Sequence, residues 1–156
     1  MRGPNIMKGY WRKPEETARA LRDGWYHSGD LGYVDEDHCL FLVDRAKDMI
    51  ISGGENVYST EVEEVLSQHP DVAECAVFGV PDDRWGEVVR AAVVLREGAT
   101  TDEEALTVHC REALGGYKVP KQIDLREDPL PRSAAGKVLK RELRAPFWQG
   151  RDRSIS

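Results

Sequence analysis

One stretch of fourteen residues, Asp44–Val57, constrains the fold of this chain more than any other. It begins with alternating acidic and basic residues over 44–48, a pattern that suits neither a buried strand nor a long helix. The short apolar run Met49–Ile51 follows and can cross a small sheet. Gly53 and Gly54 then permit backbone angles and close approaches that any side chain would prevent. The stretch therefore predicts a charged turn, a strand and a bare patch of backbone, which together suit a joint beside a ligand. A surface hairpin rich in charge and glycine fits the same local pattern.

The composition indicates a folded, soluble protein. The 156 residues suit one ordinary domain, or a small domain with a leader, and 40% are hydrophobic while 32% are charged. The formal net charge of -6 argues against a general nucleic-acid-binding or anionic-membrane-binding surface. Basic residues instead gather over 118–121 and 137–144. Local clusters of this kind favour a small molecule that carries phosphate.

The cysteines and histidines show no pattern of a disulfide framework or a metal site. The three cysteines are far apart and include no CxxC pair, which indicates reduced thiols in a cytoplasmic protein. The four histidines do not fall at zinc-ligand spacing, so we expect no metal site. No apolar run approaches the length of about 18 residues that a spanning helix needs, and the N-terminus lacks the apolar core of a signal peptide. We therefore expect no membrane span and no export.

From residue 59 onward, the pattern predicts a small α+β domain. We expect a helix capped by Ser59 or Thr60, with Glu63 completing a capping box. Strands are expected over 72–80 and 87–95, and the second is so apolar that it should be central. On the first strand, one face should carry Val72, Ala76, Phe78 and Val80. A helix over 101–114, a strand over 121–126 and a short terminal helix over 138–144 should follow. Because a tight loop joins the first two strands, they should be antiparallel.

Residues 1 to 44 do not complete a domain of their own. We expect a short helix over 14–21 and a strand over 39–43, which should form a hairpin with Met49–Ile51. Four large aromatic residues have little to bury them: Tyr10, Trp11, Trp25 and Tyr26. We therefore expect the chain to associate through these aromatics, or to keep its first 40 residues poorly ordered.

Three further motifs accompany Asp44–Val57. Residues 26–31 read Tyr-His-Ser-Gly-Asp-Leu, residues 81–87 read Pro-Asp-Asp-Arg-Trp-Gly-Glu, and residues 131–137 read Pro-Arg-Ser-Ala-Ala-Gly-Lys. In this order and at these separations, the motifs resemble those of the adenylate-forming (AMP-binding) superfamily, which contains acyl- and aryl-CoA ligases, luciferases and peptide-synthetase adenylation domains. The resemblance covers residues 3–145. His27 and Ser28 stand where the family usually has Arg and Thr.

The resemblance implies a reaction in two steps. ATP and a carboxylic acid, expected here to be a fatty acid, give an acyl-adenylate and pyrophosphate, and coenzyme A then displaces AMP to form a thioester. By this resemblance Asp30 would hold both ribose hydroxyls of the nucleotide, Arg45 would assist, and Lys137 would reach the α-phosphate. Lys47 would be the hinge, and Gly53 and Gly54 would line the channel for the thiol of coenzyme A. Simpler roles also fit: Asp30 as a turn former, and Lys47 and Lys137 as solvated surface charges.

Two parts of the family pattern are absent from these residues. Nothing resembles the Ser/Thr/Gly-rich phosphate loop, and no acyl pocket is encoded. The resemblance implies that both belong to a large N-terminal domain. That domain would also make most of the contacts to ATP and its Mg²⁺. We therefore expect residues 1–46 to be a β-rich terminal segment of that domain, 47–145 a C-terminal α+β lid with a mostly antiparallel sheet and flanking helices, and 146–156 a flexible tail. The sequence is consistent with a fragment of a longer protein, with the product of a split gene and with a natural short protein.

The expected function is the C-terminal part of an acyl-CoA synthetase that is inactive alone. The alternative is a non-catalytic module that binds a nucleotide, a coenzyme A derivative or a partner protein.

Overall fold

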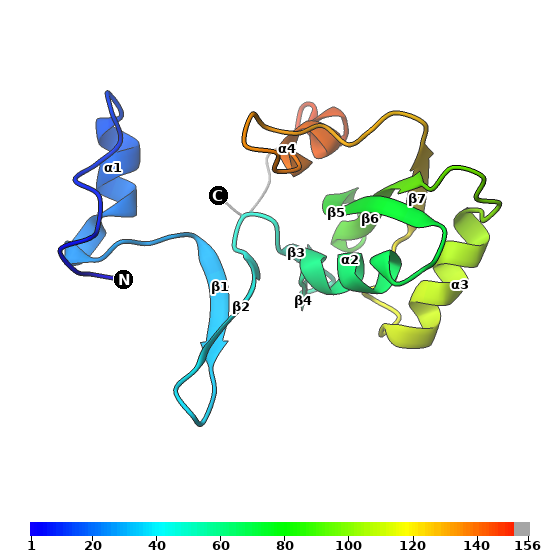
Figure 1. The fold of residues 1–156 in the computed structure, drawn as a ribbon, viewed down its shortest axis with the longest axis horizontal. Coiled ribbons are helices and arrows are strands. Elements are labelled where there is room, and N and C mark those ends of the chain that lie inside the picture. The colour runs from blue at the N-terminus through cyan, green and yellow to red at the C-terminus, as the bar shows by residue number, and fades with distance from the viewer. Residues whose placement is uncertain (152–156) are drawn as a thin grey trace. The chain divides into compact units, whose positions relative to one another are not determined.

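The structure, a computed structural model, describes residues 1–151 and divides the chain into two compact units (Figure 1). The first unit is Met1–Arg45 and the second begins at Ala46. This division lies one residue from the expected domain boundary between residues 46 and 47.

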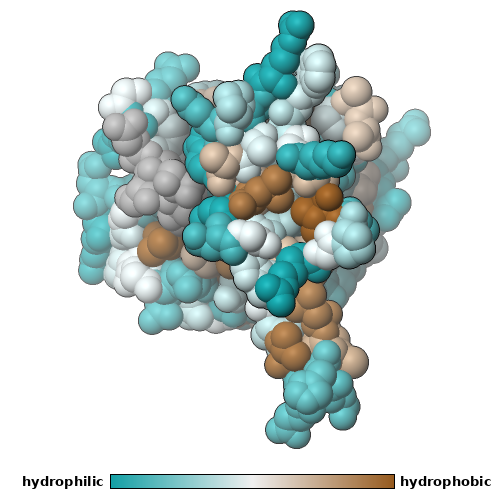
Figure 2. Space-filling view, turned by 90° about the vertical axis from the view of Figure 1, so that its left-hand side faces the viewer, coloured by the Kyte–Doolittle hydropathy of each residue, from teal (hydrophilic) through white to brown (hydrophobic). Residues whose placement is uncertain are grey.

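The first unit contains one α-helix, one short 3-10 helix and one hairpin. Its elements are α1 (Pro14–Ala20), the short 3-10 helix η1 (Arg22–Gly24), β1 (Asp30–Val34) and β2 (Leu40–Arg45). As expected, α1 begins at a proline, which has no backbone N–H to leave unpaired, and carries two acidic residues in its first turn, where the helix dipole is positive. No apolar side chain is buried within residues 1–45. Figure 2 shows hydrophobic side chains exposed along the β1–β2 hairpin, at the lower end of that view.

The hairpin of the first unit corrects one expectation. The strand over 39–43 was expected to pair with Met49–Ile51, but β2 pairs with β1 in the register Asp30↔Arg45 to Val34↔Leu40. β3 (Ile50–Ser52) is not available to β2, because β4 (Glu55–Val57) and β6 (Gly86–Leu95) occupy its two edges. The two-residue turn at Gly53 and Gly54 closes β3 onto β4 and so decides this pairing.

The second unit is an α+β domain with a mostly antiparallel sheet, as expected. Besides β3, β4 and β6, it contains α2 (Ser59–Ser67), β5 (Val72–Asp82), α3 (Glu103–Ala113), β7 (Gln122–Arg126), α4 (Lys140–Arg144) and the 3-10 helix η2 (Ala145–Trp148). The strand order is β4-β3-β6-β5, and β7 adds to β6 in parallel orientation. The most apolar strand, β6, is central as predicted, because β3, β5 and β7 all pair with it.

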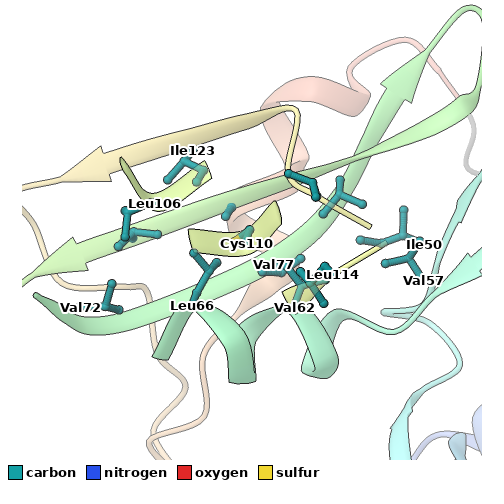
Figure 3. Packing of buried hydrophobic residues seen from close by; sticks show 14 residues of the cluster. Ile50, Val57, Val62, Leu66, Val72, Val77, Leu106, Cys110, Leu114 and Ile123 are labelled. Atoms are coloured by element: carbon teal, nitrogen blue, oxygen red, sulfur yellow. The ribbon is translucent and has the colours of Figure 1, made fainter. Parts of the chain in front are cut away.

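Both faces of this sheet are covered by helices. One face packs on α2 and α3 through a cluster that includes Val62, Leu66, Val77, Leu106 and Cys110 (Figure 3). The other face packs on α4 and η2 through Phe78, Leu130 and Leu143. Because successive residues of a strand point to opposite faces, β5 and β6 alternate between these two clusters and are apolar almost throughout.

Three details of the second unit differ from expectation. Val72 joins the cluster opposite to that of Ala76, Phe78 and Val80, because an irregularity in the β5–β6 register between Val72 and Glu74 changes the face. The N-cap of α2 is Tyr58 rather than Ser59 or Thr60, and it makes no side-chain capping bond. Residues 146–148 of the expected tail form part of η2, where the Trp148 indole donates to the Gly79 carbonyl at 3.0 Å; residues 152–156 lie outside the described part.

Candidate functional site

The two residues expected to hold a nucleotide lie opposite each other in the first unit. Asp30 begins β1 and Arg45 ends β2, and the strand register makes them direct partners. The Arg45 Nε lies 3.6 Å from the Asp30 Oδ1. The Asp30 and Arg45 side chains are 31% and 50% exposed, so an incoming polar group can reach both charges. A carboxylate held beside a guanidinium can accept two hydrogen bonds from vicinal hydroxyls.

The phenols of Tyr26 and Tyr10 accompany this pair. From the sequence they were predicted only as aromatic residues with little to bury them. Tyr26 is half-buried within the first unit. A hydrogen bond with Tyr10 is the main cause that raises the pKa of the Tyr26 phenol, and the negative charge of Asp30 adds to it. Tyr26 therefore remains a neutral hydrogen-bonding group beside Asp30.

Lys47, the expected hinge, lies at the start of the second unit, and its backbone is bound to α4. The Arg144 guanidinium donates to the Lys47 carbonyl at 3.0 Å and lies 3.6 Å from the Asp48 carboxylate. The Arg144 and Asp48 side chains are only 17% and 12% exposed, while Lys47 itself is exposed. Arg144 was not singled out from the sequence, although it donates to the carbonyl of Lys47, the second residue of the second unit.

Gly53 and Gly54 form the turn between β3 and β4 and differ in their surroundings. Both have positive φ angles, 62° and 89°, which favour glycine. A Cβ on Gly53 would lie 2.7 Å from the Trp85 ring, whereas a Cβ on Gly54 would meet nothing within 4 Å. The Gly53 amide also donates to the Trp85 carbonyl at 2.8 Å. Trp85 therefore fixes one glycine, and the other faces open space.

Lys137 lies on a small hairpin. The Ser133 amide donates to the Lys137 carbonyl at 2.8 Å, the Gly136 amide donates to the Ser133 carbonyl at 2.8 Å, and Arg132 pairs with Val138. Gly136 has a φ of 79°, so the turn needs a residue that tolerates this angle. Lys137 is exposed, and its ammonium makes no hydrogen bond or ion pair within residues 1–151. An exposed ammonium on a fixed turn is suited to meet an anion from outside.

A carboxylate of β5, which was not predicted from the sequence, connects the sheet to this hairpin. Glu74 Oε1 accepts from the Leu130 amide at 3.0 Å, and Oε2 accepts from the Arg132 guanidinium. The hydrogen bond from Leu130 and the pairing with Arg132 hold the pKa of Glu74 below its usual value. The only sequence signal for Glu74 is an acidic residue inside an apolar strand.

The candidate residues thus fall into separate groups. Asp30 and Arg45 are together in the first unit. In the second unit, Arg144 of α4 binds the Lys47 backbone, and Trp85 of the β5–β6 turn lies against Gly53. Glu74 of β5 binds Arg132 at the base of the Lys137 hairpin. Within residues 1–151, no group of three or more His, Cys, Asp or Glu side chains is arranged to bind a metal ion. No helix in the described part of the chain is long and apolar enough to cross a membrane.

Comparison with known proteins relates these features to one family. Residues 61–137 match the model of the AMP-binding enzyme C-terminal domain. The 2-succinylbenzoate–CoA ligase of Geobacillus kaustophilus is 56% identical over 144 residues, which is 92% of this chain and 29% of that ligase. A long-chain-fatty-acid–CoA ligase of Bacillus subtilis is 52% identical over 143 residues, 92% of this chain and 25% of that ligase.

The solved structures agree with this relation. The ATP-bound structure of MatB from Rhodopseudomonas palustris superimposes with a TM-score of 0.84 at 42% identity, over 94% of this chain and 29% of MatB. The chain therefore spans less than a third of the length of each of these relatives. The resemblance of the motifs is confirmed: the chain belongs with the C-terminal portion of the adenylate-forming CoA ligases, and residues 61–137 are its AMP-binding enzyme C-terminal domain.

Proposed function

We propose that these residues supply the lid and hinge of an ATP-dependent acid–CoA ligase. The observation that carries this proposal is the Lys137 hairpin, an exposed ammonium on a fixed turn within a domain of this family. The first unit would be the end of a larger N-terminal domain that holds the phosphate loop, the acyl pocket and the Mg²⁺ that accompanies ATP as substrate. The non-catalytic alternative, a nucleotide- or coenzyme A-binding module, gains no contact of its own from the structure.

In the first step, a carboxylate oxygen attacks the α-phosphorus of ATP, and the bond to the leaving pyrophosphate breaks. Lys137 would place its ammonium where negative charge increases on the α-phosphate oxygens, which lowers the barrier because the donor is already fixed. Asp30 would accept hydrogen bonds from both ribose hydroxyls, with Arg45 keeping that carboxylate oriented.

In the second step, the thiolate of coenzyme A attacks the acyl carbon and AMP leaves. The open space over Gly54 would admit the thiol-bearing arm, and Trp85 would keep the neighbouring Gly53 in place. Lys47 would change its backbone angles between the two steps, while Arg144 keeps its carbonyl attached to the lid.

The acid itself is proposed only as a class. One relative is named for 2-succinylbenzoate and the other for long-chain fatty acids, and their identities to this chain are similar. We therefore propose a fatty or aryl carboxylic acid, with the choice made by residues outside this chain.

A chimeric enzyme tests the proposed function. This chain would replace the matching portion of the Geobacillus kaustophilus ligase, and both ATP–pyrophosphate exchange and thioester formation would be measured with 2-succinylbenzoate. We expect the chimera to catalyse both reactions, and we expect no exchange from the ligase without that portion or from the 156 residues alone. A folded chimera without exchange, or exchange by this chain alone, would contradict the proposal.

We also propose that the first unit associates through its exposed apolar side chains. Trp11 is 85% exposed, and the hairpin exposes Val34, Leu40 and Leu42 by more than half. Sedimentation of the chain should show concentration-dependent association, and a monodisperse monomer would contradict it.

A further inference from the structure

Arg132 joins the Lys137 hairpin to the sheet through two separate contacts. One guanidinium nitrogen donates to the Gly136 carbonyl at 2.8 Å, and the other donates to the Glu74 carboxylate. The Arg132 side chain therefore connects Gly136, the residue before Lys137, to Glu74 of β5. A lysine at position 132 could supply only a point charge, whereas the planar guanidinium can hold two acceptors in different directions.

Glu74 is itself held in place on its other side. Its Oε1 accepts from the amide of Leu130, and the Leu130 side chain is buried between β5 and α4. The Glu74 side chain is 23% exposed, so its orientation is set mainly by protein contacts. The carboxylate thus connects the segment that enters the hairpin to the hairpin itself.

This pair contributes little to folding stability. Arg132 is 47% exposed, and an ion pair at such a site is screened by water and adds little to the free energy of unfolding. Its main structural effect is local: with Glu74 and Gly136 held, the Ser133–Lys137 turn has one geometry. The base of the Lys137 side chain then has a fixed position relative to β5.

We propose that Arg132 and Glu74 are positioning residues that orient Lys137 for adenylation. This inference rests on the proposed function, because it assigns them an effect only through Lys137. A displacement of about 1 Å at a reacting group can cost about 100-fold in rate, so releasing the hairpin slows the first step although neither residue contacts substrate. The second step does not use Lys137 and is unaffected.

The first test examines the hairpin itself in the 156-residue chain. Arg132→Met removes both contacts and keeps most of the side-chain length. Amide hydrogen exchange at Ser133 and Gly136 should become about 10-fold faster, while the urea midpoint of unfolding moves by less than about 0.5 M. Unchanged exchange at these two amides would overturn the proposal, since the hairpin would then be held without Arg132.

The second test measures both half-reactions in the chimera. Arg132→Met should lower the kcat of ATP–pyrophosphate exchange by about 10- to 100-fold with the KM for ATP within about threefold, and should leave thioester formation from supplied acyl-adenylate unchanged. Arg132→Lys should recover part of the rate. Glu74→Gln should cause a smaller loss, and the double variant should be no slower than Arg132→Met because both residues act through one connection.

Controls separate this inference from the proposed function. Arg111→Ala changes an exposed arginine of α3, outside the hairpin and outside both basic clusters, and the variant should catalyse ATP–pyrophosphate exchange at the normal rate. If Lys137→Ala abolishes exchange but Arg132→Met is normal, the positioning role is overturned and the lid function stands. If Lys137→Ala is also normal, the lid function itself is overturned.

Discussion

The Gly53 backbone lies against the ring of Trp85 so closely that a Cβ at position 53 would be 2.7 Å from Trp85 Cε3. The neighbouring Gly54 has open space at the same point of its backbone. The two glycines of one turn therefore differ in their surroundings. The Trp85 ring restricts a side chain at position 53, whereas no described atom within 4 Å restricts one at position 54.

Gly53→Ala should therefore destabilise the second unit more than Gly54→Ala. Both substitutions place alanine at positive φ, at a cost of about 1–2 kcal/mol, and Gly53→Ala adds overpacking of about 1–3 kcal/mol against Trp85. Denaturant unfolding of the variants measures both costs. In the Trp85→Ala background, the excess cost at position 53 should disappear. Equal costs at the two positions would show that Trp85 does not restrict Gly53.

Gly54→Asn tests the path proposed for coenzyme A. Asparagine tolerates positive φ better than most residues, so the variant adds a side chain with less than about 1 kcal/mol of destabilisation. In the chimera, we expect thioester formation to slow by at least about 10-fold while ATP–pyrophosphate exchange is retained. A normal thioester rate with a normal KM for coenzyme A would exclude this path.

Lys140→Met should destabilise the second unit by about 2–3 kcal/mol. The Lys140 ammonium lies 2.7 Å from Glu63 Oε1 and donates to Ser59 Oγ at 2.7 Å, and the Lys140 and Glu63 side chains are only 15% and 22% exposed. Removing the ammonium leaves a largely buried carboxylate without its countercharge. Lys121→Met, at an exposed position, is the matched control and should change the free energy of unfolding by less than about 0.5 kcal/mol. Equal effects of the two variants would refute this role for Lys140.

The three thiols should react at very different rates in the folded chain. Burial raises the pKa of Cys75 to about 12 and that of Cys110 to about 11, while Cys39 is exposed on the hairpin of the first unit. At pH 8, both raised pKa values leave almost no thiolate, so iodoacetamide should modify Cys39 first, and denaturant should be needed for all three. Reaction should remain slow at Cys75 even at pH 9. Mass spectrometry that finds Cys75 or Cys110 modified as fast as Cys39 would contradict the packing of the second unit.

Much of the second unit could be predicted from the sequence, because its signals are local. The apolar runs of β5 and β6, the tight turn between them and the Asp102 cap of α3 each depend on neighbouring residues. The strand pairing around Asp44–Val57 could not be predicted in the same way. One edge of β3 is occupied by β6, which is distant in sequence. The alternation of apolar and polar residues within β3 carries no information on which strand will pair with it.

The candidate site shows the same limit. The motifs predicted Asp30 and Arg45, and the register of β1 and β2 then accounts for their contact. Glu74 had only a weak local signal, an acidic residue inside an apolar strand, and Arg144 had none. Their partners are distant in sequence: Glu74 contacts Arg132 from 58 residues away, and Arg144 contacts Lys47 from 97 residues away. Both are charged side chains that support a candidate residue, and only the folded chain brings them to it.

Lys137→Ala in the chimera, measured in each half-reaction, tests the central claim most directly. We predict that ATP–pyrophosphate exchange falls by about 10² to 10³, because a fixed donor to the developing phosphate charge is lost. Thioester formation from supplied acyl-adenylate should stay within about threefold of the unsubstituted chimera. Exchange at the unsubstituted rate, or an equal loss in both half-reactions, would contradict the claim that Lys137 serves adenylation alone.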